Sequence, residues 1–260
     1  MKVSEDPDCR LTVMTLNLRF GRANDGPDCW ENRKERYVSF FQEYRPDIIG
    51  MQEANDFQVE FFTQILEGYN CIGQMIPSLP YWQDNLIFFQ KEWTCSSFER
   101  FFFSHTPSIP SRFQESKWPR QCVIGVFRKK NQSVVCVNTH FDFLSSVQER
   151  CAKMIVQKLS AYDNPQVPVI ITGDFNALPD SPGYREFVIH GQMKEVFHGE
   201  YSGTYHSFTG KKNDRHIDWI LYRGPVELMN KKMITDSFQG GYPSDHFPVL
   251  AEFRILTHNT

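Results

Sequence analysis

The sequence has no long apolar run, and its first residues are mostly polar. No segment reaches the ~20 consecutive apolar residues that a membrane-spanning helix requires. The opening stretch MKVSEDPDCR lacks the apolar segment of a secretory signal peptide. The seven cysteines form no CxxC pair and no zinc-like Cys/His spacing. Their odd number favours reduced thiols. We therefore expect a cytoplasmic protein without a membrane span.

The sequence also has no excess of positive charge. It carries 28 Lys and Arg against 31 Asp and Glu, a formal net charge of −3, with a pI of about 6.2. A protein that grips a long polyphosphate along its whole surface is usually basic. The basic groups at 128–130, 211–212 and 231–232 are short and typical of solvated turns. Long duplex DNA is therefore disfavoured as the substrate.

Several common catalytic motifs are missing as well. The sequence contains no Walker loop, no GxGxxG before a helix, no HExxH and no GxSxG. Nucleotide-driven, dinucleotide-dependent, zinc-protease and serine-hydrolase functions are therefore without support.

The apolar patterning predicts a sheet-rich α/β protein. With 260 residues and no compositional break, we expect one domain over residues 1–260. Helices are predicted at Glu31–Tyr44, Phe57–Leu66 and Val147–Leu159, with a short fourth near Gly183. Strands are predicted at Leu11–Leu18, Ile48–Gln52, Asn70–Ile76, Asn85–Gln90, Gln121–Arg128, Ser133–Asn138, Val167–Gly173, Trp219–Tyr222 and Pro248–Ile255. Because strands outnumber helices, this order predicts two packed sheets with helices outside. The proline-containing segment Ser104–Pro119 is predicted to be a long surface loop, and loops of this length in a compact domain are often functional.

The strongest local motif is the segment VIITGDFN at 169–176. A buried strand delivers Asp174 and, two residues later, Asn176 on the same side of the pleat. A carboxylate beside an amide can hold a water molecule and contact a phosphate oxygen. The alternative is an ordinary Asp/Asn turn after a strand.

A second motif, Ser244-Asp245-His246, leads into the last predicted strand. His246 is a candidate general base because histidine titrates near neutral pH. Asp218, at the start of an apolar strand, could orient that imidazole. The alternatives are a solvated loop histidine and a surface ion pair between Asp218 and Arg215.

Four further polar residues lie at the ends or starts of predicted strands. Glu53 is a natural ligand for a hard cation such as Mg²⁺, and Asn17 could support the metal or contact phosphate. His140 could assist the leaving oxygen in phosphodiester cleavage. Arg120 could bind a nonbridging phosphate oxygen. Each residue alone is ambiguous, because strand-terminal polar residues are common.

Taken in order, these motifs resemble those of the endonuclease/exonuclease/phosphatase superfamily of metal-dependent phosphoesterases. The resemblance covers nearly the whole chain and rests on the residues 15–17, 51–53, 138–140, 173–176, 217–219 and 244–246. It implies an α/β four-layer sandwich, in which two mostly antiparallel β-sheets pack face to face and are flanked by helices.

The resemblance also implies roles for individual residues. Mg²⁺ or Mn²⁺ ligation is implied for Glu53, Asn17 and Asp245. Catalytic roles are implied for His246, Asp218, His140, Asp174 and Asn176. Substrate binding is implied for Arg120, Asn17 and His206.

Differences from the motifs of individual branches show which part of the superfamily the sequence resembles. The residues at 176–178 and 215–218 do not fit the inositol polyphosphate phosphatase pattern. The stretch 203–210, together with 244–249, is similar to a compact, mostly bacterial subgroup of undefined substrate. In that subgroup His206 would line the pocket, although an ordinary loop histidine is an equal alternative.

The sequence thus predicts a monomeric, Mg²⁺-dependent phosphodiesterase. Its substrate would be a nucleic acid, a nucleotide or a small phosphodiester. The enzymatic alternative is a phosphomonoesterase that acts on a small phosphorylated metabolite. A binding module that retains the fold is disfavoured, because all the catalytic positions are occupied by suitable residues.

Overall fold

The computed structural model describes residues 9–76 and 81–256. Its α-helices are α1 (Trp30–Glu43), α2 (Asp56–Ile65), α3 (Ser145–Leu159) and α4 (Pro182–Arg185), the last continuing into a π-helical turn, η4 (Glu186–His190). Short 3₁₀ turns are η2 (Gly26–Asp28) and η3 (Ser160–Tyr162). In the described part of the chain no helix combines the length and apolarity needed to cross a membrane.

The first sheet has six strands in the order β11-β12-β1-β2-β4-β3. They are β1 (Arg10–Asn17), β2 (Ile48–Ala54), β3 (Tyr69–Ile72), β4 (Asp84–Gln90), β11 (Val226–Met233) and β12 (Val249–Ile255). Only β1 and β2 pair in parallel, and the other neighbours are antiparallel.

The second sheet also has six strands, in the order β5-β6-β7-β8-β10-β9. They are β5 (Thr94–Phe102), β6 (Gln121–Lys129), β7 (Gln132–His140), β8 (Val169–Asp174), β9 (Lys194–Glu195) and β10 (Asp218–Arg223). Here β7 and β8 form the parallel pair, and the other neighbours are antiparallel.

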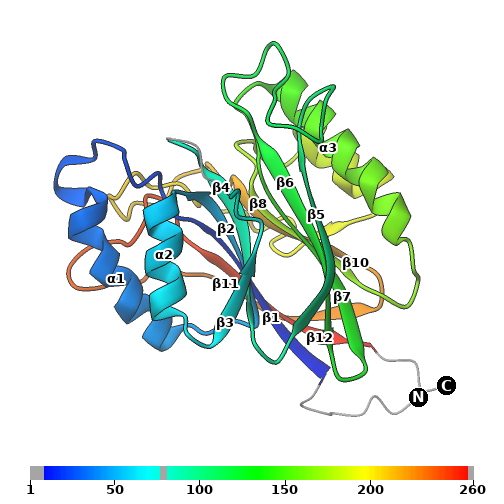
Figure 1. Cartoon of the computed structure of the whole chain (residues 1–260), viewed down its shortest axis with the longest axis horizontal. Helices are drawn as coiled ribbons and strands as arrows, with labels where there is room; N and C mark the ends of the chain where they lie inside the picture. Colours follow the sequence, from blue (N-terminus) through cyan, green and yellow to red (C-terminus); the bar gives the residue numbers. More distant parts are fainter. Residues whose placement is uncertain (1–8, 77–80, 257–260) are drawn as a thin grey trace.

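Three apolar layers hold these elements together. Alternate residues of both sheets, such as Val13 and Phe127, meet between the sheets. Helices α1 and α2 cover the outer face of the first sheet with side chains such as Phe40. Helix α3 covers the outer face of the second sheet with residues such as Ile155 (Figure 1). The predicted four-layer sandwich is therefore confirmed.

A buried polar contact fixes the two sheets relative to each other. At Gly50 the sheets approach so closely that an added Cβ would lie 2.0 Å from Thr172 Oγ1. Gln52 Nε2 donates to Asn138 Oδ1 at 2.6 Å, and Asn138 Nδ2 donates to the carbonyl of Met51 at 2.7 Å. Buried polar groups must be paired to be tolerated. These bonds therefore align the strand ends that carry the site.

The sequence missed three strands. Strand β5 reads TCSSFERFF and is largely exposed, so it shows no clean apolar alternation. Strand β11 is partly exposed and mixes charged with apolar residues, and β9 has only two residues. The strand predicted at Asn70–Ile76 ends earlier, at Ile72. The predicted loop Ser104–Pro119 contains neither helix nor strand.

Candidate active site

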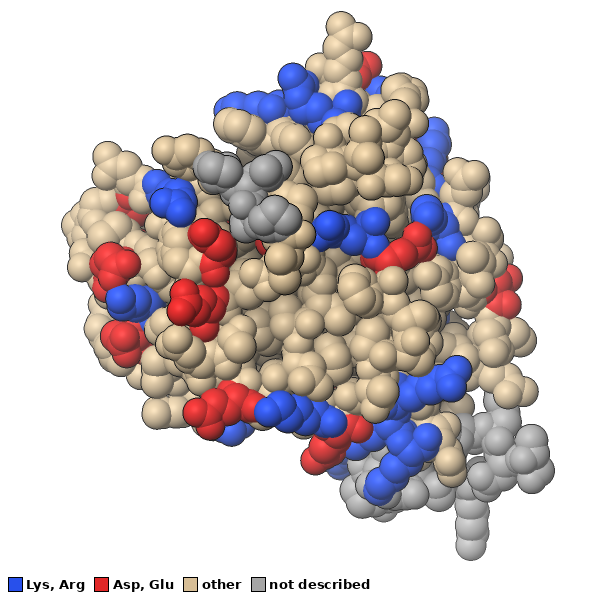
Figure 2. Space-filling view, viewed as in Figure 1, with Lys and Arg blue, Asp and Glu red and all other residues tan. Residues whose placement is uncertain are grey.

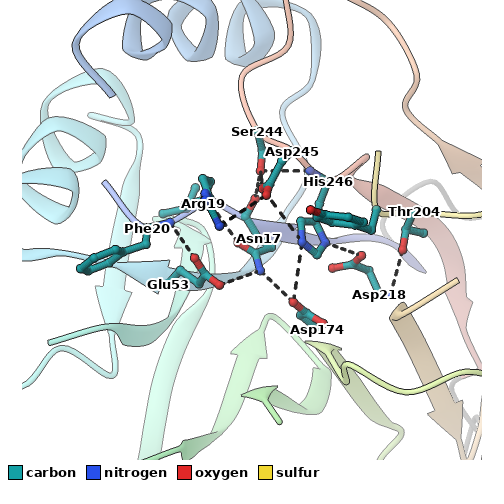
Figure 3. Close-up of polar contacts among 12 residues, drawn as sticks. Asn17, Arg19, Phe20, Glu53, Asp174, Thr204, Asp218, Ser244, Asp245 and His246 are labelled. Atoms are coloured by element: carbon teal, nitrogen blue, oxygen red, sulfur yellow. Dashed lines mark hydrogen bonds and ion pairs between the residues drawn. The ribbon is translucent and has the colours of Figure 1, made fainter. Parts of the chain in front are cut away.

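Polar side chains from both sheets converge at one end of the sandwich. The first sheet supplies Asn17 and Glu53, and the second supplies His140, Asp174 and Asp218. The segment before β12 adds Asp245 and His246 (Figure 3). Of the predicted site residues, Asn176, Arg120 and His206 are not in this group but lie beside it.

Glu53 is placed by an irregularity in β2. Its φ of 66° is left-handed, and the pairing of β2 with β4 shifts between Met51 and Ala54. Left-handed backbone at a non-glycine residue costs free energy and is often found at functional sites. The backbone N–H of Phe20 donates to Glu53 Oε2 at 2.6 Å, and Asn17 Nδ2 lies 3.4 Å from Oε1 (Figure 3).

Asn17 links the carboxylates of the two sheets. Its Nδ2 donates to Asp174 Oδ2 at 2.8 Å as well as facing Glu53. Its Oδ1 accepts the backbone N–H of Arg19 at 2.8 Å. In this arrangement the amide nitrogen of Asn17 orients the two carboxylates.

Asp174 lies at the centre of the group and is 2% exposed. Burial, together with the nearby Asp218 carboxylate, raises the pKa of Asp174 to about 7. The backbone N–H of Asn176 donates to Asp174 Oδ1 at 2.9 Å, in a turn where Asn176 has a φ of 47°. The motif is therefore both an Asx turn and a part of the site.

His246 is paired with a buried carboxylate. Its Nδ1 donates to Asp218 Oδ2 at 2.8 Å, which leaves Nε2 directed towards Asp174 Oδ2 at 3.9 Å and Asp245 Oδ1 at 4.0 Å. Burial by itself lowers the pKa of His246. The Asp218, Asp174 and Asp245 carboxylates outweigh that effect and raise the pKa well above its ordinary value.

Asp218 is itself held by a residue that the sequence did not single out. Its backbone N–H donates to Thr204 Oγ1 at 3.1 Å, as does the N–H of Ile217. Thr204 is fully buried. The only sequence signal for it was its place in the stretch 203–210, where a buried threonine cannot be told from a loop threonine.

His140 has a different partner. Arg120 NH1 lies 2.9 Å from His140 Nδ1, and a guanidinium can only donate. Nδ1 therefore accepts, and the imidazole proton is on Nε2, which lies 3.4 Å from Asp174 Oδ2. Burial and the Arg120 charge lower the pKa of His140 well below its ordinary value.

Asn176 lies beside this histidine. Its Nδ2 is 3.0 Å from His140 Nε2 and donates to the carbonyl of Phe141 at 3.1 Å. Since Nε2 carries the proton, it accepts no hydrogen bond from Asn176 Nδ2. The Asn176 amide therefore lies next to the His140 N–H, beside Asp174.

The donor set suits a divalent cation. The ligand-type atoms of Glu53, His140 and Asp174 all lie within 4.8 Å of one another, and those of Asp174, Asp218 and His246 form a second such group. Because Arg120 occupies His140 Nδ1 and the ring proton is on Nε2, the first group offers its two carboxylates, and not the imidazole, to a cation. Carboxylate oxygens are the preferred ligands of Mg²⁺. Asp245 belongs to neither group among the described residues, and its Oδ2 lies 3.7 Å from Arg19 NH1.

Arg19 is a site residue that sequence analysis missed. It has a φ of 59° and forms two hydrogen bonds with Asp25, at 2.9 Å from Nε and 2.6 Å from NH2. This pairing holds the guanidinium between Asp245 and Glu53 (Figure 3). The only feature of the sequence that could have indicated Arg19 as a site residue is its position two residues after Asn17.

His206 is buried beneath the Asp245 segment. Its ring stacks on Phe247 with centroids 3.9 Å apart, and its Nδ1 accepts a hydrogen bond from the backbone N–H of Gly210. The backbone N–H of His206 donates to the Asp245 carbonyl. Burial lowers its pKa to about 4. These contacts give His206 a packing role, and its contact with substrate stays a prediction.

A pocket of about 520 Å³ opens beside Glu53. Its walls come from the segment after β1, the residues before β4 and the end of the loop 104–119. The lining residues are Arg19, Phe20, Ala23, Glu53, Tyr81, Trp82, Gln83, Trp118, Pro119 and Arg120. Because Glu53 and Arg120 line it, the pocket is continuous with the site.

The fold and the site together define a metal-dependent phosphoesterase. Residues 14–246 match the model of the endonuclease/exonuclease/phosphatase family, and the chain belongs to this family. The family depends on divalent metals, and the carboxylate and histidine groups described above are suited to hold one. No curated protein matched the chain.

Several solved structures are similar over almost the whole chain. A family protein from Bacteroides thetaiotaomicron has a TM-score of 0.86 and 25% identity, covering 95% of this chain and 98% of its own. A mannosyl-6-phosphatase from the same organism has a TM-score of 0.86 and 26% identity, covering 94% and 99%. TDP2 from D. rerio, in complex with a single-strand DNA product, has a TM-score of 0.74 and 17% identity, covering 94% and 99%. The last likeness concerns the fold alone.

Proposed function

We propose that this protein hydrolyses phosphate esters with the help of Mg²⁺ or Mn²⁺, by in-line attack of water. The observation that carries the proposal is the pair of buried histidines near Asp174, one bound to a carboxylate and the other to a guanidinium. One environment favours a base and the other favours a neutral hydrogen-bond donor. Hydrolysis of an alkyl phosphate ester is accelerated by both functions.

The Asp218–His246 pair would activate the water. In its unprotonated form, His246 Nε2 accepts the proton of the attacking water while the water oxygen bonds to phosphorus. Asp218 keeps the proton on Nδ1 and stabilises the imidazolium that results. Asp174 Oδ2, 3.9 Å from Nε2, would orient the same water.

The Arg120–His140 pair would act on the phosphate and its leaving oxygen. As the bond between phosphorus and that oxygen breaks, His140 Nε2–H donates a hydrogen bond or its proton to the oxygen. Arg120 would bind a nonbridging oxygen through its remaining N–H groups, and Asn176 Nδ2 would add a second donor.

Glu53 would be the principal metal ligand, with Asp174 beside it and Asp245 and Asn17 in support. The cation supplies charge neutralisation at the phosphate when bound. Glu53 accepts only one short hydrogen bond, from the N–H of Phe20, and is the most exposed carboxylate of its candidate group. It therefore keeps acceptor capacity for a cation.

The sequence favours a phosphodiester as the substrate. A second candidate, a phosphomonoester of a small metabolite, is supported by the similarity to the mannosyl-6-phosphatase and by a pocket of about 520 Å³ at the site. Both candidates share the same attack on phosphorus. A monomeric, cytoplasmic, single-domain protein remains our expectation.

The test compares p-nitrophenyl phosphate with bis(p-nitrophenyl) phosphate, each in excess Mg²⁺ and in excess chelator. We expect turnover of at least one ester that chelator abolishes and that Mg²⁺ or Mn²⁺ restores. Glu53→Gln should raise the metal concentration needed for half-maximal rate, whereas Glu60→Gln, on exposed α2 surface, should not. Full activity in chelator would refute the metal-dependent proposal.

A further inference from the structure

Arg33, on helix α1, is a buried cation that no carboxylate neutralises. Its side chain is fully buried. In the described part of the chain, the ion pairs of α1 involve Lys34 and Arg36, and none involves Arg33. The Trp30 ring, with its centroid 5.1 Å from the Arg33 Cζ, offers partial compensation. Because an arginine is rarely buried completely without a partner, the groups that Arg33 contacts instead indicate its role.

The partners of Arg33 are three backbone carbonyls in two segments far apart in the sequence. Its NH1 donates to the Leu18 carbonyl at 2.8 Å, and its NH2 donates to the Arg19 carbonyl at 2.8 Å. The same NH1 also donates to the Pro243 carbonyl at 2.7 Å. Leu18 and Arg19 follow the end of β1, whereas Pro243 lies shortly before the proposed base, His246. One planar guanidinium therefore joins the two segments in a fixed geometry.

The bonds to Leu18 and Arg19 aim two N–H groups at the site. In a trans peptide group the carbonyl and the N–H point in opposite directions. The Leu18 carbonyl shares its peptide group with the Arg19 N–H, which donates to Asn17 Oδ1 at 2.8 Å. The Arg19 carbonyl shares its peptide group with the Phe20 N–H, which donates to Glu53 Oε2 at 2.6 Å (Figure 3). A side chain that holds the two carbonyls therefore also holds the two donors.

Ser244 makes a second link between the same segments. It is fully buried, and its hydroxyl donates to the Asn17 carbonyl at 2.6 Å. The N–H of His246 in turn donates to Ser244 Oγ at 3.3 Å. Arg33 and Ser244 together hold the segment before β12 against the end of β1. These contacts therefore set the place of His246 relative to Glu53.

We infer that Arg33 is a positioning residue, which aligns the Glu53 side of the site with the His246 side. The inference rests on the proposed function, because it assigns a further residue to that reaction. Arg33 acts through peptide groups, in a turn where Arg19 has a left-handed φ of 59° and needs contacts that hold it. The N–H groups of this turn keep the Asn17 and Glu53 oxygens in place before a cation binds, which lowers the entropic cost of binding.

The first experiment measures Mn²⁺ binding to the metal-free protein by calorimetry. Arg33→Met keeps a long apolar stem and removes every donor. We expect this variant to raise the Kd of Mn²⁺ by about tenfold or more, because groups that hold metal ligands commonly contribute about ten- to a hundredfold to affinity. Two of the three carbonyls keep another donor, Tyr37 Oη and Gln58 Nε2, each at 3.1 Å. The variant should therefore fold.

Three further variants assign the effect to the link between the segments. Arg33→Lys keeps the charge but loses the planar fork, so its Kd should lie between those of the wild type and Arg33→Met. Ser244→Ala removes the second link and should raise the Kd by a smaller factor. Arg36→Met is the matched control on α1. Arg36 bonds to Asp28 and to the Tyr242 carbonyl but not to the turn after β1, so its loss should leave the Kd unchanged.

Hydrogen exchange in the metal-free protein separates positioning from a general loss of stability. In Arg33→Met the backbone N–H groups of Arg19, Phe20 and His246 should exchange faster than in the wild type. Those of α3, which covers the other sheet, should keep their protection, because local opening need not involve the whole domain.

An unchanged Mn²⁺ Kd in folded Arg33→Met would overturn the inference. Equal loss of protection in α3 would also overturn it, because that pattern indicates a structural role alone. If Arg33→Met did not fold, Arg33→Lys would be judged by the same two measurements. Neither measurement uses hydrolysis. Weaker Mn²⁺ binding by the variant, together with an inactive wild type, would refute the proposed function and leave the role of Arg33 standing. An active wild type with an unchanged Kd in the variant would do the reverse.

Discussion

His140 and His246 lie near the same carboxylate oxygen but in opposite electrostatic surroundings. Their Nε2 atoms are 3.4 and 3.9 Å from Asp174 Oδ2. Burial lowers the pKa of both. Arg120 lowers that of His140 further, whereas Asp218 and its neighbouring carboxylates raise that of His246. The sign of the partner charge, and not burial, separates the two residues into a neutral donor and a strong base.

The largest expected effect comes from removing the base. His246→Ala should lower kcat by about a hundred- to ten-thousandfold, the usual contribution of a general acid–base step. His190→Ala, at a histidine on the surface turn after α4, is the control and should have no effect. Circular dichroism should show both variants folded. Near wild-type turnover by folded His246→Ala would remove this residue from the mechanism.

His140→Ala should lower kcat by a similar factor, but the size of this effect should depend on the leaving group. An alkoxide needs the hydrogen bond or proton from Nε2, so alkyl esters should lose about a hundredfold or more. A p-nitrophenolate leaves without a proton, so kcat for p-nitrophenyl esters should fall much less. Equal losses for both kinds of ester would mean that His140 acts elsewhere in the reaction.

Replacing the partner of His246 should change the pH dependence. Because Asp218 raises the pKa of His246, the unprotonated base forms only at higher pH. Asp218→Asn should therefore move the acidic limb of the pH profile of kcat/KM to lower pH, while kcat falls. Asp163→Asn, an exposed aspartate remote from this pair, is the control. An unmoved limb would show that His246 is not the titrating group.

Replacing the partner of His140 should have a smaller effect on the rate. Arg120→Ala removes a phosphate contact and should raise KM more than it lowers kcat. The variant should also raise the pKa of His140, because the adjacent positive charge is lost. NMR titration of the His140 ring can measure this directly. A fall in kcat with unchanged KM would argue against a role for Arg120 in binding.

The smallest effect concerns salt. Figure 2 shows basic side chains in separate groups, some beside acidic ones, and the net charge is −3. We expect kcat/KM for duplex DNA to fall with salt at a slope equivalent to about one to three phosphate contacts, at roughly −0.9 per contact. A steep slope with nanomolar affinity would reveal a nucleic-acid track formed by the loop 104–119 and the lysine pairs.

Strand-end polar residues were predictable from the sequence because buried strands with a terminal carboxylate, amide or imidazole stand out against apolar neighbours. Asp174, His246 and Asp218 were found in this way, and their hydrogen bonds agree with the predicted pairing of the last two. The helices and most strands followed from periodicity. Strands β5 and β11 did not, because their exposed faces carry mixed residues.

The sequence by itself determined the fold class, the family and the residue types of the site, since these depend on local pattern and order along the chain. The tertiary structure decided what those residues do to one another. The opposite pKa shifts of two histidines, the bridging contacts of Asn17, and the contribution of Arg19 all arise between residues far apart in sequence or from backbone turns. Electrostatic coupling depends on distance in space and on burial, and neither can be read from spacing along the chain.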